Sequence, residues 1–120
     1  MDDKASVSSL KKEVAKFRNE RDWLKFHNPK DLSIALSIES SELEEIFLWK
    51  ETMSASRIKK DRRQFNRVKE EVADIFIYLL SLSNVLELDM SEAVAEKLEQ
   101  NARKYPVSKS KGSNKKYNEL

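Results

Sequence analysis

The chain has 120 residues and a mass of 14.0 kDa, and 39% of its residues are hydrophobic and 37% charged. It contains no cysteine and one histidine, which excludes a disulfide scaffold, thiolate metal sites and any site that needs two imidazoles. The 23 Lys and Arg nearly balance the 21 Asp and Glu, so no large net charge compels binding to nucleic acid. Carboxylates, amines, guanidinium groups, hydroxyls and aromatic rings remain for chemistry.

Neither a targeting segment nor a membrane span is visible. The start Met1-Asp2-Asp3-Lys4 is not followed by an apolar stretch. The longest apolar run, residues 75–80, is far shorter than the roughly 18 residues that a span needs. We therefore expect a soluble protein of the cytoplasm.

The first half of the chain predicts two helices. Apolar residues at Leu10, Val14 and Phe17 form one stripe of a helix over residues 6–21. The pair Asn28-Pro29 breaks the chain, and a second helix starts at Pro29 or Asp31 and runs to about residue 51. Residues 52–60 carry no periodicity and are expected to form a loop.

The second half predicts two more helices and a tail. A helix over residues 61–87 turns apolar on nearly all sides from Val72, so it should be central or lie at a subunit interface. Asp89 or Ser91 caps a helix that Tyr105-Pro106 stops. Residues 1–106 are thus expected to form an all-α, four-helix, oligomeric domain, and residues 107–120 a basic flexible tail.

Two pairs of carboxylates stand out by their spacing. Glu39 and Glu42 in the second helix, and Glu71 and Asp74 in the third, are each three residues apart and project from one face. Asp74 lies in the apolar part of its helix, where an uncompensated carboxylate is costly. If the two helices pack antiparallel, four acidic groups converge, and oxygen ligands without His or Cys favour Mg²⁺ or Mn²⁺.

The acidic pairs have a plainer interpretation as well. A chain this rich in Glu produces about one or two such pairs by chance, and most charged runs are solvated helix faces. From the residues alone, the metal site and a solvated acidic face are about equally supported, and the surroundings of Asp74 favour the metal site.

The order E-x-x-E, an intervening segment and E-x-x-D resembles the signature of the all-α nucleotide pyrophosphohydrolases, the MazG-like superfamily. The resemblance extends in order over roughly residues 10–118 and is to the dCTP pyrophosphatase branch. It is carried by Glu20-Arg21-Asp22-Trp23, Phe26-His27, Pro29, Glu42-Leu43, Phe47-Leu48-Trp49, Glu70-Glu71, Asp74-Ile75, Ile77-Tyr78-Leu79, Asn101, Tyr105-Pro106-Val107, Gly112-Ser113 and Lys116-Tyr117.

The resemblance implies that Glu39, Glu42, Glu71 and Asp74 are the catalytic Mg²⁺ ligands, with Mn²⁺ as a substitute. Such a metal bridges phosphate oxygens and positions or activates a water for attack on phosphorus. Which carboxylate takes the proton of that water stays open. Glu45, one turn beyond Glu42, either supports the metal site or is solvated.

The resemblance also implies a substrate pocket. Trp23, Phe26, His27, Trp49 and Tyr78 match positions near the base, although their spacing alone would place the aromatic rings in a core. A further set, at one face of the fourth helix, matches phosphate-binding positions or is a solvated face: Lys97, Asn101 and Lys104.

Two positions depart from the pattern of that branch. Ser40-Ser41 replaces an apolar residue and a glycine between the first two acids, which changes local packing. Val14 stands where close relatives present a polar ring residue, so the base preference is affected more than the reaction.

The expected activity is a Mg²⁺-dependent hydrolysis of dCTP or a modified dCTP to the nucleoside monophosphate and pyrophosphate, by a dimer or tetramer. dUTP, other nucleoside triphosphates and phosphoribosyl-ATP are alternative substrates. Two rivals belong to other classes: a helical interaction module whose acids are surface charge, and a nucleic-acid binder that uses basic residues 57–69 and the tail. Neither a membrane nor a nucleic acid is the expected partner.

Overall fold

The computed structural model describes residues 1–120, and all its regular elements are helices, as the sequence predicted. By its internal contacts the chain divides into two compact units, Met1–Glu87 and Leu88–Leu120, and each is described by itself. The first unit contains α1 (Val7–Glu20), η1 (Leu24–Phe26), α2 (Pro29–Phe47), α3 (Ala55–Lys60) and α4 (Arg62–Val85).

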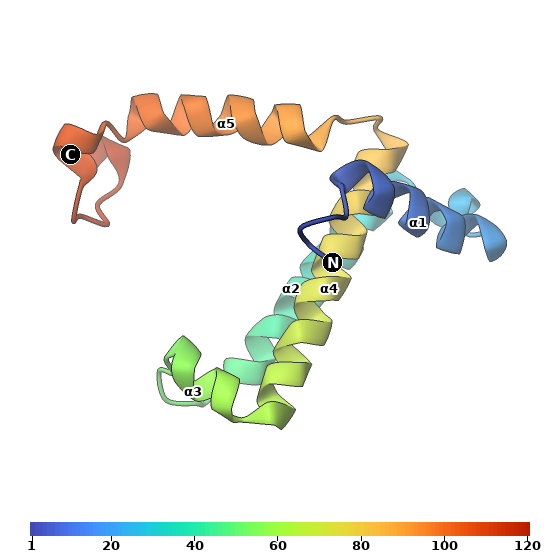
Figure 1. Ribbon diagram of the computed structural model, residues 1–120, viewed down its shortest axis with the longest axis horizontal. Coiled ribbons are helices and arrows are strands. Elements are labelled where there is room, and N and C mark those ends of the chain that lie inside the picture. Colours follow the sequence, from blue (N-terminus) through green and yellow to red (C-terminus); the bar gives the residue numbers. More distant parts are fainter. The chain divides into compact units, whose positions relative to one another are not determined.

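The first unit is built on the pair α2 and α4, which lie side by side and antiparallel (Figure 1). Helices α1 and α3 pack against α4. The buried apolar core is small and comes from α2 and α4 alone: Leu32, Ile46 and Leu80. A hydrogen bond of 3.0 Å joins α4 to α1: Asn84 Nδ2 donates to the backbone carbonyl of Lys11. The pairing of α2 with α4 holds the two predicted acidic stretches against each other.

Side-chain caps start the long helices where the sequence indicated. Asn28 accepts a hydrogen bond from the N–H of Asp31, and Pro29 occupies the first position of α2. Asp61 caps α4 through the N–H of Gln64. Asp89 caps α5, which confirms one of the two predicted capping residues.

The segment after α2 differs from the prediction. Helix α2 ends at Phe47 rather than near residue 51, because Leu48 takes an extended backbone conformation with ψ 132°. Trp49 then takes a left-handed conformation with φ 61°. Ser54 then caps the short helix α3, inside the stretch expected to be a loop. A helix of one and a half turns buries too little for a hydrophobic period to appear in the sequence.

The second unit contains α5 (Met90–Lys104), α6 (Val107–Ser110) and η2 (Tyr117–Glu119). Its chain end folds back locally: the rings of Tyr105 and Tyr117 meet edge to face at 6.2 Å, and Lys104 Nζ lies 5.1 Å from the centre of the Tyr117 ring. The domain boundary at residue 106 and the flexibility of residues 107–120 stay predictions.

The helix pair leaves much apolar surface uncovered within one chain. On α2, Ile34 and Ile38 are half exposed at a spacing of four residues. On α4, Val72, Phe76 and Leu79 are also partly exposed, and their spacings of four and three residues place them on one stripe. Helix α4 was expected to be apolar around most of its surface, and one chain supplies cover for only part of it. No helix of the chain combines the length and the apolarity of a membrane span.

Candidate active site

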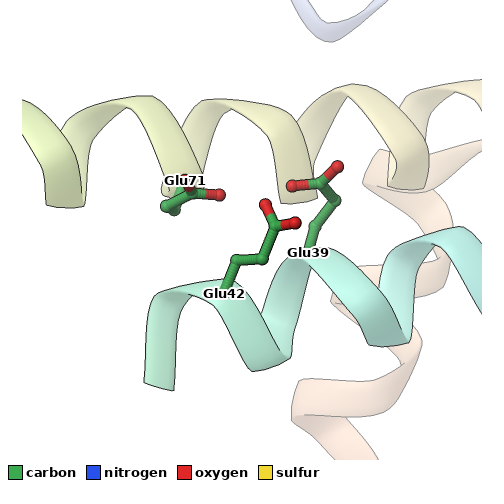
Figure 2. Close-up of side chains that lie close together, drawn as sticks. All are labelled: Glu39, Glu42 and Glu71. Atoms are coloured by element: carbon green, nitrogen blue, oxygen red, sulfur yellow. The ribbon is translucent and has the colours of Figure 1, made fainter. Parts of the chain in front are cut away.

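The antiparallel pair α2 and α4 brings three glutamates together. Glu39 and Glu42 project from one face of α2, and Glu71 projects toward them from α4 (Figure 2). One carboxylate oxygen from each lies within 4.8 Å of the others. The predicted convergence of carboxylates from two helices is therefore present for three of the four residues.

The fourth predicted ligand, Asp74, is close enough for its charge to raise the pKa of Glu39 and of Glu71, but it lies outside the tight group of three. Its side chain is exposed, whereas the sequence analysis placed it in buried surroundings. The prediction that Asp74 is buried was wrong. The sequence of α4 is apolar around this residue, but within a single chain no other helix covers this side of α4.

The carboxylates disturb one another's ionisation. Partial burial, followed by hydrogen bonding to and repulsion by Glu42, raises the pKa of Glu39 to about 7. Partial burial and the charge of Glu42 also raise the pKa of Glu71. Every charge that acts on Glu39 is negative. The cluster therefore gains by binding either a proton or a cation.

The donor set fits a hard divalent cation. Glu39 Oε2 and Glu71 Oε2 are buried oxygens without a hydrogen-bond partner, and buried acceptors of this kind call for a ligand or a proton. Three converging carboxylates, with no nitrogen or sulfur donor, match the preference of Mg²⁺ and Mn²⁺ for oxygen.

The serines between Glu39 and Glu42 are accommodated inside α2. Ser40 Oγ donates to the carbonyl of Leu36 at 2.9 Å, and Ser41 Oγ donates to that of Ser37 at 3.0 Å. Each hydroxyl is thus satisfied by the preceding turn. The unusual spacer leaves both glutamates free to point at α4.

Several predicted base-binding residues lie before α2. Trp23 is partly exposed and packs edge to face on Phe17 at 5.8 Å. Phe26 is exposed, with Lys25 Nζ 5.4 Å from its ring centre. His27 is half-buried, its Nδ1 has no hydrogen-bond partner, and burial and the charge of Arg18 lower its pKa. A neutral imidazole with an orphaned nitrogen suits contact with a polar ligand.

Two other predicted base-binding residues, Trp49 and Tyr78, lie elsewhere. Trp49 follows α2 and is 94% exposed, so it packs against nothing in its own chain. Tyr78, one turn beyond Asp74 on α4, is half-buried. The core interpretation of the tryptophans is therefore wrong within one chain. That either residue contacts a substrate stays a prediction.

The predicted phosphate-binding residues belong to the second unit. Lys97 and Lys104 are exposed on α5, and Asn101 is half-buried between them. Their common stripe is present on the helix, but their role stays a prediction.

Sequence reasoning missed one feature near the carboxylates. The basic residues 57–69 were expected to face solvent, but some of them gather in a recess at the start of α4. Arg63 and Arg67 line a recess with Ile46. The spacing of four residues from Arg63 to Arg67 to Glu71 was the available signal, because it places all three on one face of a helix.

The chain is similar in sequence to known proteins. The MazG-like family model matches residues 34–120. The dCTP pyrophosphatase 1 of Bos taurus is 37% identical over 115 residues, which are 96% of this chain and 68% of the relative. The Homo sapiens protein of the same name is 35% identical over the same shares.

A solved structure shows the same architecture. A pyrophosphatase from Archaeoglobus fulgidus superposes with a TM-score of 0.70 at 46% identity, covering 79% of this chain and 87% of that one. The chain belongs to the MazG-like family.

Proposed function

We propose that this protein is a Mg²⁺-dependent pyrophosphohydrolase that cleaves dCTP or a modified dCTP to the nucleoside monophosphate and pyrophosphate, and so removes unwanted nucleotides from the cytoplasmic pool. The MazG-like family and the dCTP pyrophosphatase relatives support a hydrolase that acts on nucleoside triphosphates. The observation that carries the proposal is the group of Glu39, Glu42 and Glu71 across two helices, with two orphaned oxygens.

In this proposal Glu39, Glu42 and Glu71, joined by Asp74, hold Mg²⁺, with Mn²⁺ as a substitute. A bound ion of this kind neutralises phosphate charge and lowers the pKa of a water. The chain's own contribution is to fix the carboxylates: α2 and α4 set their spacing, and the core beside them keeps it. Carboxylates alone repel a polyphosphate, so these residues act on a nucleotide only together with the cation.

The base is assigned to aromatic residues and the phosphates to α5. A flat pyrimidine stacks well on rings, and such stacking is worth roughly 1–3 kcal/mol per base. The orphaned Nδ1 of His27 supports a polar contact. The full proposed set is Trp23, Phe26, His27, Trp49 and Tyr78 for the base, and Lys97, Asn101 and Lys104 for the phosphates.

One chain cannot bring all these residues to one base. Trp23 precedes α2 and Trp49 follows it, and the 19 residues of that helix span roughly 28 Å. The two segments lie at opposite ends of the helix (Figure 1). Stacked rings have centroids only about 4.5–7 Å apart. If both tryptophans contact one nucleotide, a second copy of the chain supplies one of them.

The uncovered apolar surface supports the same oligomeric arrangement. Ile38 is 54% exposed on α2 and Phe76 45% exposed on α4, each with apolar neighbours along its stripe. Contiguous apolar stripes of this kind mark interaction surfaces. A second copy presents the same stripes and covers them without any other partner, so we assign a dimer or tetramer to the active form.

A nucleotide panel tests the proposed function. Purified protein is incubated with Mg²⁺ and each of dCTP, 5-methyl-dCTP, dUTP, dTTP and CTP, and pyrophosphate and orthophosphate are measured separately. We expect pyrophosphate, most rapidly from a cytosine deoxynucleotide, and loss of the activity in Glu71→Gln. Orthophosphate as the main product would overturn the assigned bond. A protein that hydrolyses none of the panel would be better described as a helical interaction module.

A further inference from the structure

A cationic recess lies at the end of α2, between the segment that follows this helix and the first turns of α4. It has a volume of about 450 Å³, within the range of small-molecule sites. Three basic side chains line it together with one carboxylate and three uncharged residues: Lys50, Arg63, Arg67, Asp61, Gln64, Ile46 and Met53. All belong to the first unit of the chain.

The position of the recess follows from helical spacing. Arg67 precedes Glu71 by four residues on α4, and Ile46 follows Glu42 by four residues on α2. One helical turn, a rise of roughly 5–6 Å, therefore separates the recess from the acidic cluster on both helices. Anything bound in the recess lies beside a group held at the carboxylates.

The basic groups of the recess are not neutralised within the protein. The ion pairs of the chain do not include Lys50, Arg63 or Arg67. The carboxylate of Asp61 already accepts the N–H of Gln64 as the cap of α4. A second hollow shares Met53, Asp61 and Gln64 with the recess and adds Lys60 and Arg57, of which Arg57 pairs with Glu51 at 4.0 Å.

We propose that this recess is a binding site for a phosphate-class oxyanion, with Lys50, Arg63 and Arg67 as its cationic contacts. Guanidinium groups match phosphate oxygens with paired hydrogen bonds. The recess is lined by no aromatic ring, so it is unsuited to a nucleobase. The residues that the family resemblance assigns to phosphate lie on α5, so this site is additional to them.

The anion has two possible sources of the same chemistry: the phosphate chain of a bound nucleotide, or free pyrophosphate. Only this choice of source rests on the proposed function. The binding site itself rests on the lining residues and their charges.

Inorganic pyrophosphate in excess EDTA is the probe, because it tests the recess without metal and without turnover. Binding is measured by calorimetry at constant ionic strength on the full chain. Arg63→Gln and Arg67→Gln should each weaken binding about tenfold or more, the loss expected for one charge-assisted hydrogen bond. Arg62→Gln is the matched control, because it removes the same group from the adjacent residue, outside the recess lining.

Three results would overturn the site: wild-type protein that does not bind pyrophosphate, Arg63→Gln and Arg67→Gln that bind it normally, or Arg62→Gln that weakens binding as much as Arg63→Gln. Binding of single-stranded RNA in preference to pyrophosphate, with steep salt dependence, would also overturn it. Each of these is independent of whether the protein hydrolyses nucleotides.

Steady-state kinetics with dCTP and Mg²⁺ then identify the source. A raised KM in Arg67→Gln, with little change in kcat, assigns the recess to the phosphate chain of the substrate. An unchanged KM together with weaker inhibition by pyrophosphate assigns it to the free anion. Both results support an oxyanion site. Circular dichroism of each variant checks that the helices remain folded.

Discussion

Glu39 on α2 and Glu71 on α4 face each other, and each keeps one buried carboxylate oxygen without a hydrogen-bond partner. Such a pair is unfavourable as it stands, because buried acceptors lose their water and like charges repel. It is retained at the centre of a small helical unit whose core has three buried apolar side chains. The unpaired buried oxygens and the repulsion between these two carboxylates are the physical reason to expect a ligand between the two helices.

Magnesium should stabilise the folded protein. We expect the melting temperature to rise with Mg²⁺ concentration, because an ion that binds only the folded state shifts the unfolding equilibrium. Glu71→Gln should abolish that rise and, since metal ions supply several kcal/mol of transition-state stabilisation, lower kcat/KM by roughly a hundredfold or more. Differential scanning fluorimetry and a pyrophosphate assay measure the two effects.

Glu44→Gln is the control for that experiment, because Glu44 is an exposed glutamate of the same helix outside the group of three. It should keep both the stabilisation and the activity. Asp74→Asn tests the residue that lies outside the tight group: a retained Mg²⁺ effect would show that three glutamates suffice. A wild-type melting temperature indifferent to Mg²⁺ would contradict the metal site.

The stability of the metal-free protein should fall as pH rises. The pKa of Glu39 is raised from 4.5 to about 7, so the folded state binds an extra proton between these values. The stability that this proton gives is complete below pH 4.5 and is lost as pH rises through about 7. We therefore expect the melting temperature in EDTA to fall between about pH 4.5 and about pH 7, the window that the two pKa values set.

Glu39→Gln removes this contribution, because the amide cannot titrate, whereas Glu71, whose pKa is also raised, titrates in both proteins. The lowered pKa of His27 acts in the opposite direction, with stability lost as pH falls, but it is the same in both proteins. The difference in melting temperature between wild type and Glu39→Gln should hence change with pH. A difference that stays constant from acid to alkaline pH would refute the raised pKa.

The acidic cluster was predictable because it depends on local spacing. Glu39 and Glu42 share a face at any helix with 3.6 residues per turn, and the long uninterrupted pattern after Asp61 leaves few alternatives to an antiparallel pair. Its surroundings were not predictable in the same way. The exposure of Asp74 depends on what covers α4, which is a property of packing and not of the residues near it in sequence.

The end of α2 shows the other limit. Leu48 ends the helix with an extended backbone, and Trp49 follows with a positive φ that tryptophan seldom adopts; neither conformation is visible in the neighbouring sequence. The cationic recess was missed because the predicted helix start at residue 61 does not say what its basic side chains face, and the recess forms only where the segment after α2 lies against them. The backbone conformation after α2 therefore determines which charged side chains lie close together.

The core of α2 and α4 should be sensitive to truncation. Leu80 is 3% exposed, so Leu80→Ala should lower the free energy of unfolding by about 2–5 kcal/mol, from lost burial and the cavity left behind. Urea denaturation monitored by circular dichroism measures the change. Leu86→Ala is a control of the same type, because Leu86 is 47% exposed and should cost much less. Equal costs would contradict the placement of the core.

The apolar stripe of α4 should hold the oligomer together. Phe76→Ser replaces a ring that is 45% exposed and so only partly packed within its own chain. It should therefore reduce the mass of the oligomer while having a smaller effect on the stability of the monomer. Light scattering coupled to size-exclusion chromatography measures the mass across a dilution series. Phe17→Ser changes a ring of similar exposure on α1 and is the control. A wild-type protein that is monomeric throughout would rule out this role.

A shared active site should reveal itself by complementation between two inactive chains. Trp49→Gly keeps the positive φ that the backbone needs and removes only the ring, whereas Glu71→Gln disables the carboxylates. In a mixed oligomer, the intact carboxylates of one chain meet the intact tryptophan of the other, so co-expression should recover part of the dCTP activity that neither variant has alone. Pyrophosphate release from co-purified, differently tagged chains is the measurement. If the mixed oligomer is as inactive as its components, every site is contained in one chain, and Trp49 does not reach across to the carboxylates of its partner.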